Sequence, residues 1–353
     1  MREETFRRDR LFFYHKERKM ERRTFLKLAG IAAAGNLALK NITLPGKAWA
    51  KDIYPARKIT WIVPVKPGGG FDTLARFLSL QLPSAFKELA PAAKGGDIII
   101  KNVPEAGGRR AYAGVFRAEP DGYTIGDFNL GFITENITAK PEFDVTKFTF
   151  LLRTGVSIRV IATKKDGFKS WKEMMAAAKE REIKWAAGNF GRGAHIDSIL
   201  AKEAMGIPAK LINFAGTAEG ASAIIRGDVQ VGLFSMDSIQ GLLKAGEFRL
   251  LLIFDDKSEF PGVPTSTELG YPDLAENIRY QRYMVGPPGV SKNVAGVICA
   301  AFKKTLAKKE VIEWADRMEF PILPLYGDEA DRVARNVMNF YVKMTPTLMK
   351  YLK

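Results

Sequence analysis

ITWIVPVKPGGGFDTLAR, residues 59–76, is the stretch from which the fold can be derived. Its first part, residues 59–63, is a short apolar run rich in β-branched and aromatic residues, which is typical of a strand buried on both faces. Residues 64–70 then carry two prolines and three consecutive glycines, which break regular structure. Leucine and phenylalanine recur at helical spacing after Asp72, a residue type that caps helices well. The stretch therefore predicts a strand, a glycine turn and a helix.

This predicted turn would leave the first backbone amides of the helix bare, beside a loop that has few side chains to block an approaching molecule. Helix N-termini favour anions, often a carboxylate or a phosphate. The same residues also suit a tight strand–helix connection that binds nothing. The turn by itself is compatible with both alternatives.

Strand-like and helix-like segments alternate through the rest of the chain. The order strand, helix, strand, helix, strand up to Phe128 predicts a parallel sheet with right-handed crossovers. A similar alternation follows, with further glycine loops at 188–193 and 215–217. We therefore expect an α/β protein of two lobes joined by two crossover segments, which form a hinge beside a cleft. The predicted first lobe comprises residues 51–155 and 281–353, and the second comprises residues 156–280.

Residues 1–50 have the three parts of an export signal. Residues 21–27 contain a twin-arginine pattern, residues 28–39 are apolar but short for a bilayer span, and residues 48–50 form an A-x-A cleavage site. We expect cleavage after Ala50 and a periplasmic location, with an uncleaved amphipathic anchor as the alternative. Met20 stands just before the twin-arginine pattern, and we expect it to be the true start.

Composition narrows the class of ligand. The chain has 54 basic and 39 acidic residues; without the 12 and 5 in residues 1–50, 42 and 34 remain, a net charge of +8. This excess suits an acidic small ligand or an acidic surface. A block of basic residues interleaved with aromatic residues would indicate nucleic-acid binding, and the sequence has no such block. No further apolar stretch is long enough to span a membrane, so the mature protein should not be membrane-embedded.

Cofactor and catalytic motifs are lacking. His15 and His195 are the only histidines and cannot form a histidine-rich metal site, while Cys299 has no partner for an internal disulfide. The sequence has no G-x-S-x-G nucleophile elbow, no phosphate loop ending in Gly-Lys-Ser/Thr, and no G-x-G-x-x-G after the first strand. Nothing in the sequence places Asp72, His195 and Asp237 together as an acid/base set. We expect a non-catalytic protein without a cofactor.

Several short motifs, in this order and spacing, resemble the Bug family, the periplasmic solute receptors of tripartite tricarboxylate transporters. The resemblance implies a type II periplasmic-binding fold and a monomeric receptor that captures a small carboxylate between closing lobes for the membrane subunits of such a transporter. A sensor that presents the bound carboxylate to a membrane signalling kinase is the alternative. The motifs are Val63-Pro64 with 67–72 and Ala75-Arg76, 102–108 followed by 120–124, Gly188-Asn189 with His195, 214–216, 227–234, Pro264-Thr265 with Glu268 and Gly270, and 286–289.

Ligand contacts are expected from both lobes, because only contacts made in the closed state shift the lobes toward closure. The first lobe should contribute Lys66, Gly69, Gly70, Phe71, Asp72 and Asn129, and the second Asn189, Arg192, Gly216, Thr217 and Asp237.

Some of these residues have simpler alternative roles. Asp72 should cap the helix or act through water, Lys66 also suits a solvent-facing position, and His195 also suits a role in orienting its loop. Arg192 suits either a bidentate contact with a carboxylate or the rim of the cleft. Lys66 and Phe71, and the loop with Phe190 and Arg192, depart from the family's usual residues. These two added cations and two added aromatics favour an aromatic or more highly charged ligand.

Overall fold

The computed structural model describes residues 53–68, 70–134, 142–318 and 320–352, so the predicted export signal and Gly69 lie outside the described residues. Within these ranges, Lys257–Gly262 is separate from the unit described below and contains turns but no helix or strand. The architecture below concerns the described part of that unit, residues 53–256 and 263–352.

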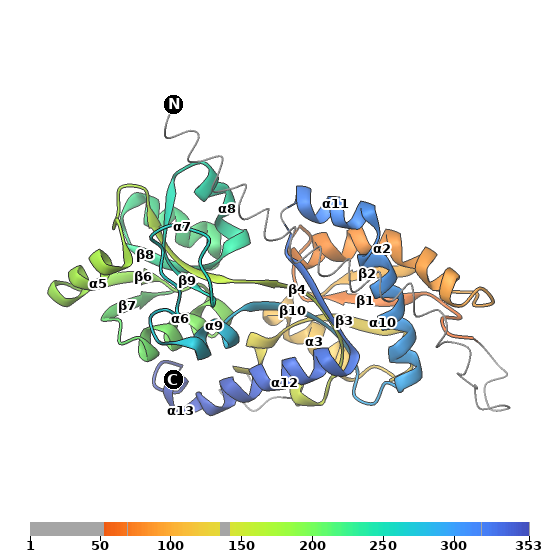
Figure 1. The fold of residues 1–353 in the computed structure, drawn as a ribbon. Coiled ribbons are helices and arrows are strands. Elements are labelled where there is room, and N and C mark those ends of the chain that lie inside the picture. The colour runs from red at the N-terminus through yellow and green to blue at the C-terminus, as the bar shows by residue number, and fades with distance from the viewer. Residues whose placement is uncertain (1–52, 69, 135–141, 319, 353) are drawn as a thin grey trace. The chain divides into compact units, whose positions relative to one another are not determined.

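The first lobe is built on a six-stranded sheet with the order β11-β4-β10-β3-β1-β2 (Figure 1). β1 pairs in parallel with β2 and β3, whereas β10 is antiparallel to β3 and β4, and β11 is antiparallel to β4. The predicted strand at residues 59–63 is therefore an inner strand of the sheet, as its unbroken apolar run requires. The strands are β1 (Ile59–Val63), β2 (Ile98–Asn102), β3 (Thr124–Asn129), β4 (Thr149–Ser157), β10 (Tyr280–Gly286) and β11 (Ile322–Tyr326).

The second lobe repeats this plan with a five-stranded sheet of order β7-β6-β8-β5-β9. β6 pairs in parallel with β7 and β8, and β5 is inserted antiparallel between β8 and β9. In each sheet the inserted antiparallel strand is the first strand that the chain forms after it passes from the other lobe. β5 follows β4 of the first lobe, and β10 follows β9 of the second. The strands are β5 (Arg159–Lys164), β6 (Ile183–Ala186), β7 (Ala209–Ile212), β8 (Val231–Ser235) and β9 (Phe248–Phe254).

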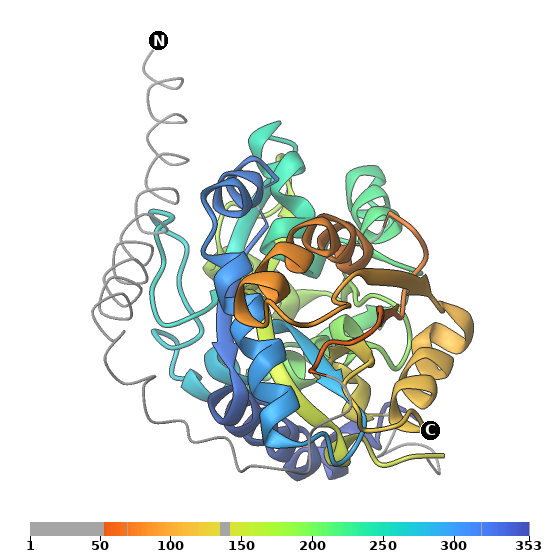
Figure 2. The same ribbon diagram turned by 90° about the vertical axis from the view of Figure 1, so that its right-hand side faces the viewer.

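Helices cover both sheets. α2 and α10 lie side by side over one face of the first sheet in both views (Figures 1 and 2). Trp61 of β1 and Phe302 of α10 pack there with ring centroids 5.6 Å apart, and both rings are fully buried. Serine side chains cap α5 and α10 by accepting backbone N–H bonds in the first turn. The helices are α2 (Gly70–Leu89), α3 (Arg109–Phe116), α5 (Trp171–Glu180), α6 (Gly193–Ala204), α7 (Thr217–Arg226), α8 (Met236–Lys244), α9 (Pro272–Asn277), α10 (Lys292–Leu306), α11 (Lys309–Arg317), α12 (Gly327–Lys343) and α13 (Thr345–Leu348), with short 3-10 turns η2 (Glu105–Gly108), η3 (Leu130–Phe132) and η4 (Val145–Lys147).

The two lobes predicted from the alternation of strands and helices are thus present, each as a sheet with its own helices. The chain passes from β4 to β5 at Ile158 and returns between β9 and β10. The C-terminal end also contacts the second lobe, because α13 packs against α6 and Tyr341 of α12 donates a hydrogen bond to Asp197 at 2.7 Å. The residue boundaries of the lobes stay a prediction.

Candidate ligand-binding site

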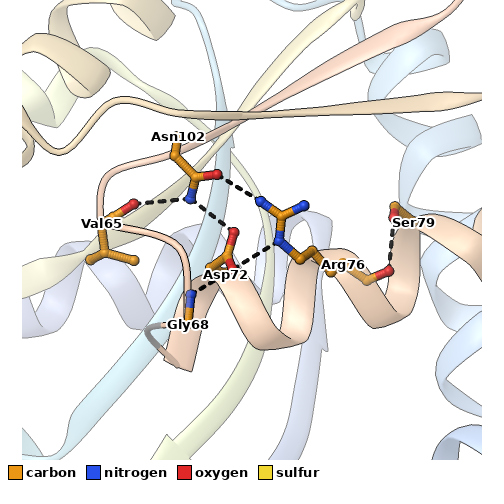
Figure 3. A network of polar contacts seen from close by, with 6 residues as sticks. All are labelled: Val65, Gly68, Asp72, Arg76, Ser79 and Asn102. Carbon is orange, nitrogen blue, oxygen red and sulfur yellow. Dashed lines mark hydrogen bonds and ion pairs between the residues drawn. The ribbon is translucent and has the colours of Figure 1, made fainter.

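The start of α2 is organised by the carboxylate of Asp72, which lies in the first turn and is 2% exposed. Asp72 accepts hydrogen bonds from the Gly68 amide at 2.8 Å, Arg76 Nε at 2.9 Å and Asn102 Nδ2 at 2.8 Å (Figure 3). Asn102, at the end of β2, also donates to the carbonyl of Val65 at 3.0 Å. One carboxylate therefore joins the glycine turn, the helix and the neighbouring strand.

Opposing influences act on the pKa of Asp72. Burial alone would raise the pKa, but the hydrogen bonds from Arg76, Gly68 and Asn102 outweigh burial and hold it below its usual value. The carboxylate stays ionised at neutral pH, and its contacts give it a structural role in shaping the turn.

Replacing Asp72 with asparagine should lower the free energy of unfolding by about 1–2 kcal/mol. The side-chain NH2 of asparagine would face an N–H group from which the carboxylate now accepts a hydrogen bond. Urea unfolding of the two proteins measures this difference. Asp331→Asn is the matched control, since Asp331 pairs with Arg335 at the same i,i+4 spacing but is more exposed. The control should cost about 0.5 kcal/mol or less, and an equal loss in both variants would contradict the role given to Asp72.

The other predicted residues of this turn have different surroundings. Lys66 is exposed, and Gly69 lies outside the described residues. Gly70 begins α2, and a Cβ built on it would lie 4.0 Å from Arg282 Nη2. The Phe71 ring is 5% exposed and packs in the first-lobe core, 6.5 Å from the Tyr280 ring. A ligand at this turn would therefore meet the backbone of Phe71 and not an open aromatic face.

The second-lobe glycine loop precedes α6 and is shaped by His195. The buried His195 ring accepts a hydrogen bond from the Gly191 amide at its Nδ1 at 3.0 Å. Burial lowers the pKa of His195 to about 4, so the ring is neutral near pH 7 and available as an acceptor. Asn189 and Phe190 are exposed, and the Phe190 ring lies 5.0 Å from the His195 ring. This hydrogen bond gives His195 the loop-orienting role.

The same loop contacts the first lobe through Arg192. Its Nη2 donates to the carbonyl of Ala106 in η2 at 3.3 Å, and its guanidinium lies 5.8 Å from the Phe132 ring. A Cβ on Gly107 would lie 2.1 Å from Arg192 Nη2, and the φ of Gly107 is +65°, so glycine permits both the turn and this approach.

A second contact between the lobes lies beside Arg192. Thr134 donates to the carbonyl of Gly191 at 3.3 Å. Asn129 caps η3 by accepting from the Gly131 amide at 2.8 Å, and a Cβ on Gly131 would lie 3.0 Å from the Cα of Gly193. Asn129 therefore belongs to the segment of the first lobe that meets the start of α6.

Gly216 and Thr217 form the start of α7, where Gly216 is fully extended and caps the helix without a side chain. Glu219 accepts a hydrogen bond from the Ala215 amide at 2.8 Å, which satisfies one donor at this helix start. Gly216 and Thr217 are half-buried, and the hydrogen bonds of the described residues do not join them to the contacts around Arg192.

Asp237 is engaged at the hinge. It lies in the first turn of α8 and accepts from the Ser157 hydroxyl at the end of β4 in a short hydrogen bond. It also pairs with Arg282 of β10, whose Nη2 is 2.8 Å from Asp237 Oδ2. The Arg282 side chain is only 5% exposed. This ion pair joins the second lobe to a strand of the first.

A second buried ion pair lies nearby and was not predicted. Arg159, the first residue of β5, donates through Nε and Nη2 to one oxygen of Asp197 in α6 at 2.8 and 2.7 Å. The other Asp197 oxygen accepts from the hydroxyl of Tyr341. Burial raises the pKa of Asp197, while the charge of Arg159 and the Tyr341 hydrogen bond oppose that rise. The Tyr280 ring lies 5.2 Å from the Arg159 guanidinium and 4.6 Å from that of Arg282.

Arg159 and Arg282 share a sequence signal that was not among the predicted site features. Each is a lone charge within an apolar strand, in SIRVIA (157–162) and YQRYMV (280–285), directly after a crossing between the lobes. Arginine is rarely buried unless it is paired, so such positions favour a paired or functional arginine. Its partners are not visible in the sequence.

The structure does not assemble a catalytic set from the acidic residues and the histidine. Asp72 is held by the glycine turn, His195 by the loop before α6, and Asp237 by Ser157 and Arg282. Within the described ranges, the histidine, cysteine and acidic side chains form no cluster of three or more suited to a metal ion. In the same part of the chain no helix is both long and apolar enough to cross a membrane.

A groove of about 860 Å³ lies on the second lobe beside the loop that precedes α6. It is lined by the end of α5, by β7, by Phe190 and His195 and by Tyr351 near the C-terminus, and none of the residues predicted to contact the ligand is among its lining.

Comparison with known proteins decides the family. The model for the "Tripartite tricarboxylate transporter family receptor" (TctC) matches residues 87–339. The chain belongs to the TctC receptor family. Among curated relatives, protein BugT of Bordetella pertussis is 25% identical over 288 residues, which are 78% of this chain and 84% of BugT.

Solved structures have the same fold as this TctC receptor. A TctC solute-binding protein from Polaromonas, solved without ligand, has a TM-score of 0.70 at 22% identity, covering 84% of this chain and 100% of the other. MatC of Rhodopseudomonas palustris, solved with bound malate, has a TM-score of 0.65 at 21% identity, covering 83% and 99%. The predicted type II periplasmic-binding fold is confirmed. The TctC family consists of periplasmic solute receptors, so this chain is a receptor and not an enzyme.

Proposed function

We propose that this TctC receptor captures a small carboxylate between its two lobes and delivers it to the membrane subunits of a tripartite tricarboxylate transporter. The observation that carries the proposal is that the two lobes contact each other through residues predicted to bind the ligand. Arg192 donates to the carbonyl of Ala106, and Asp237 pairs with Arg282. A molecule held beside these contacts would touch both lobes, as ligand-driven closure requires.

Three features support a carboxylate as the ligand. The start of α2 adjoins the guanidinium of Arg282, and both favour an anion. The chain without residues 1–50 is basic, with 42 basic and 34 acidic residues. The similar receptor MatC was solved with malate, which is a dicarboxylate.

A thermal-shift screen of di- and tricarboxylates, aromatic acids, amino acids and neutral sugars tests the ligand class. A carboxylate present at a hundred times its dissociation constant should add about 2.7 kcal/mol of stability. For a chain of this size that gain should raise the melting temperature by about 5 °C or more. A shift with neutral sugars and with no carboxylate would refute the proposal.

The location and the delivery step belong to the same proposal. We propose cleavage after Ala50 and release into the periplasm, so the exported protein should begin at Lys51 by N-terminal sequencing. Membrane vesicles that contain the transporter subunits should accumulate the carboxylate identified in the screen only when the receptor is added. Uptake that does not depend on the receptor would contradict delivery and leave the sensor alternative.

A further inference from the structure

Arg282 has more hydrogen-bonding capacity than the described residues use. Its Nη2 binds Asp237, and the rings of Tyr280 and Phe320 lie 4.6 and 4.8 Å from its guanidinium carbon. Its Nε and Nη1 are buried, and neither has a hydrogen-bond partner in the described part of the chain. A guanidinium carries five N–H donors that lie in its plane, so aromatic rings do not satisfy them.

A buried charged donor without an acceptor is costly, and native proteins rarely contain one unless it has a function. Arg282 is 4% exposed, so bulk water does not solvate the two nitrogens freely. A bound acceptor would remove this penalty. An anionic acceptor would fit best, because hydrogen bonds from a guanidinium to a carboxylate are the strong ones.

The position of Arg282 also points to a ligand. The start of α2 lies against it, since a Cβ on Gly70 would be 4.0 Å from Arg282 Nη2 and would meet no other atom that close. α2 has 20 residues, and its first amides add partial positive charge at this point. An acceptor bound here would receive hydrogen bonds from the strand β10 and from the helix start together.

Asp127 of β3 is the nearby acidic group that could compete for this role. It is 2% exposed, and its Oδ2 has no hydrogen-bond partner among the described residues, so it does not satisfy Arg282. Burial raises the pKa of Asp127 well above its usual value, and the charge of Arg282 offsets this only in part. A protonated Asp127 would be a donor and would not repel an incoming anion.

We propose that Arg282 binds a carboxylate of the ligand through an N–H group of Nε or Nη1 at the start of α2, and so selects carboxylates over neutral solutes. The inference rests on the proposed receptor function and adds the residue that recognises the negative charge of the ligand. Asp237 is then a positioning residue, which holds the guanidinium through Nη2 and leaves its other donors for the ligand.

Isothermal titration with succinate, malate, adipate and citrate tests the role of Arg282. The fully amidated analogue of the acid that binds most tightly carries no charge and serves as the paired probe. The wild-type protein should bind at least one of these acids 10–100-fold more tightly than its amide analogue. Arg282→Lys keeps the positive charge beside Asp237 but lacks the fork of donors. It should weaken binding of that acid 10–100-fold and lose most of the discrimination, while its circular dichroism spectrum stays unchanged.

A second pair of variants at Gly70 keeps the test informative if Arg282→Lys does not fold. Gly70→Asp would place a carboxylate beside Arg282, so it should raise the melting temperature and weaken acid binding at least 10-fold. The matched Gly70→Asn adds the same bulk without the charge, and it should show neither the rise nor a loss of that size. Equal effects of Asp and Asn would overturn the inference.

The two proposals fail in different ways. If the wild-type protein binds an acid and Arg282→Lys binds it equally well with the same discrimination, Arg282 is structural and only the inference fails. If the wild-type protein binds a neutral solute and none of the acids, the proposed function fails as well.

Discussion

Replacing Asp197 with alanine should lower the free energy of unfolding by about 3–5 kcal/mol. Asp197 and Arg159 form an ion pair with side-chain exposures of 2% and 5%, and the substitution would leave the guanidinium buried without a counter-ion. Removing one partner of a buried pair costs far more than the intact pair contributes, because the remaining charge cannot be solvated. The Tyr341 hydroxyl would lose its acceptor in the same step. Urea unfolding at pH 7 measures the effect.

The control for Asp197 is Asp228→Ala. Asp228 also pairs with an arginine, Arg226, at 2.7 Å, but the two side chains are 55% and 59% exposed. Solvent replaces such a contact at little cost, so the control should leave the stability nearly unchanged. Similar losses in both variants would show that the burial of the Arg159–Asp197 pair has no particular effect.

Acidification should destabilise the protein through His195. Burial lowers the pKa of this ring in the folded state from 6.5 to about 4, so between these values the unfolded chain binds a proton that the folded chain does not. The contribution is fully present above pH 6.5 or so and is lost as the pH falls toward about 4. The shift corresponds to a loss on the order of 2–3 kcal/mol across this window.

Comparing the wild-type protein with His195→Asn isolates this effect from the carboxylates, which titrate in both proteins. The amide oxygen of asparagine can accept from the Gly191 amide in place of Nδ1, but it has no proton to gain. Urea midpoints at pH 7 and pH 4.5 should therefore differ less in the variant. An identical change with pH in both proteins would assign the acid sensitivity to other groups.

The alternating plan of this protein was predictable from short stretches. β1, the glycine turn and α2 follow from an apolar run, consecutive glycines and helical spacing, all of which act within a few residues. β11 was missed, because Pro324 interrupts its pattern and proline is tolerated only at an edge such as the one β11 occupies. α9 was missed because it has only six residues, too few to show a helical period.

The sequence by itself thus determined two α/β lobes, the glycine loops at their strand ends and, through the order of its motifs, the receptor family. Only the tertiary structure decided which charges meet. Asp237 is 80 residues from Ser157 and 45 from Arg282, and Asp197 is 38 from Arg159. Turn and helix preferences are local, whereas the burial that makes these pairs strong exists only once the two sheets have packed. For that reason the sequence can mark Arg282 as a lone charge in an apolar strand, whereas only the fold shows that it pairs with Asp237 and keeps two buried donors without a partner among the described residues.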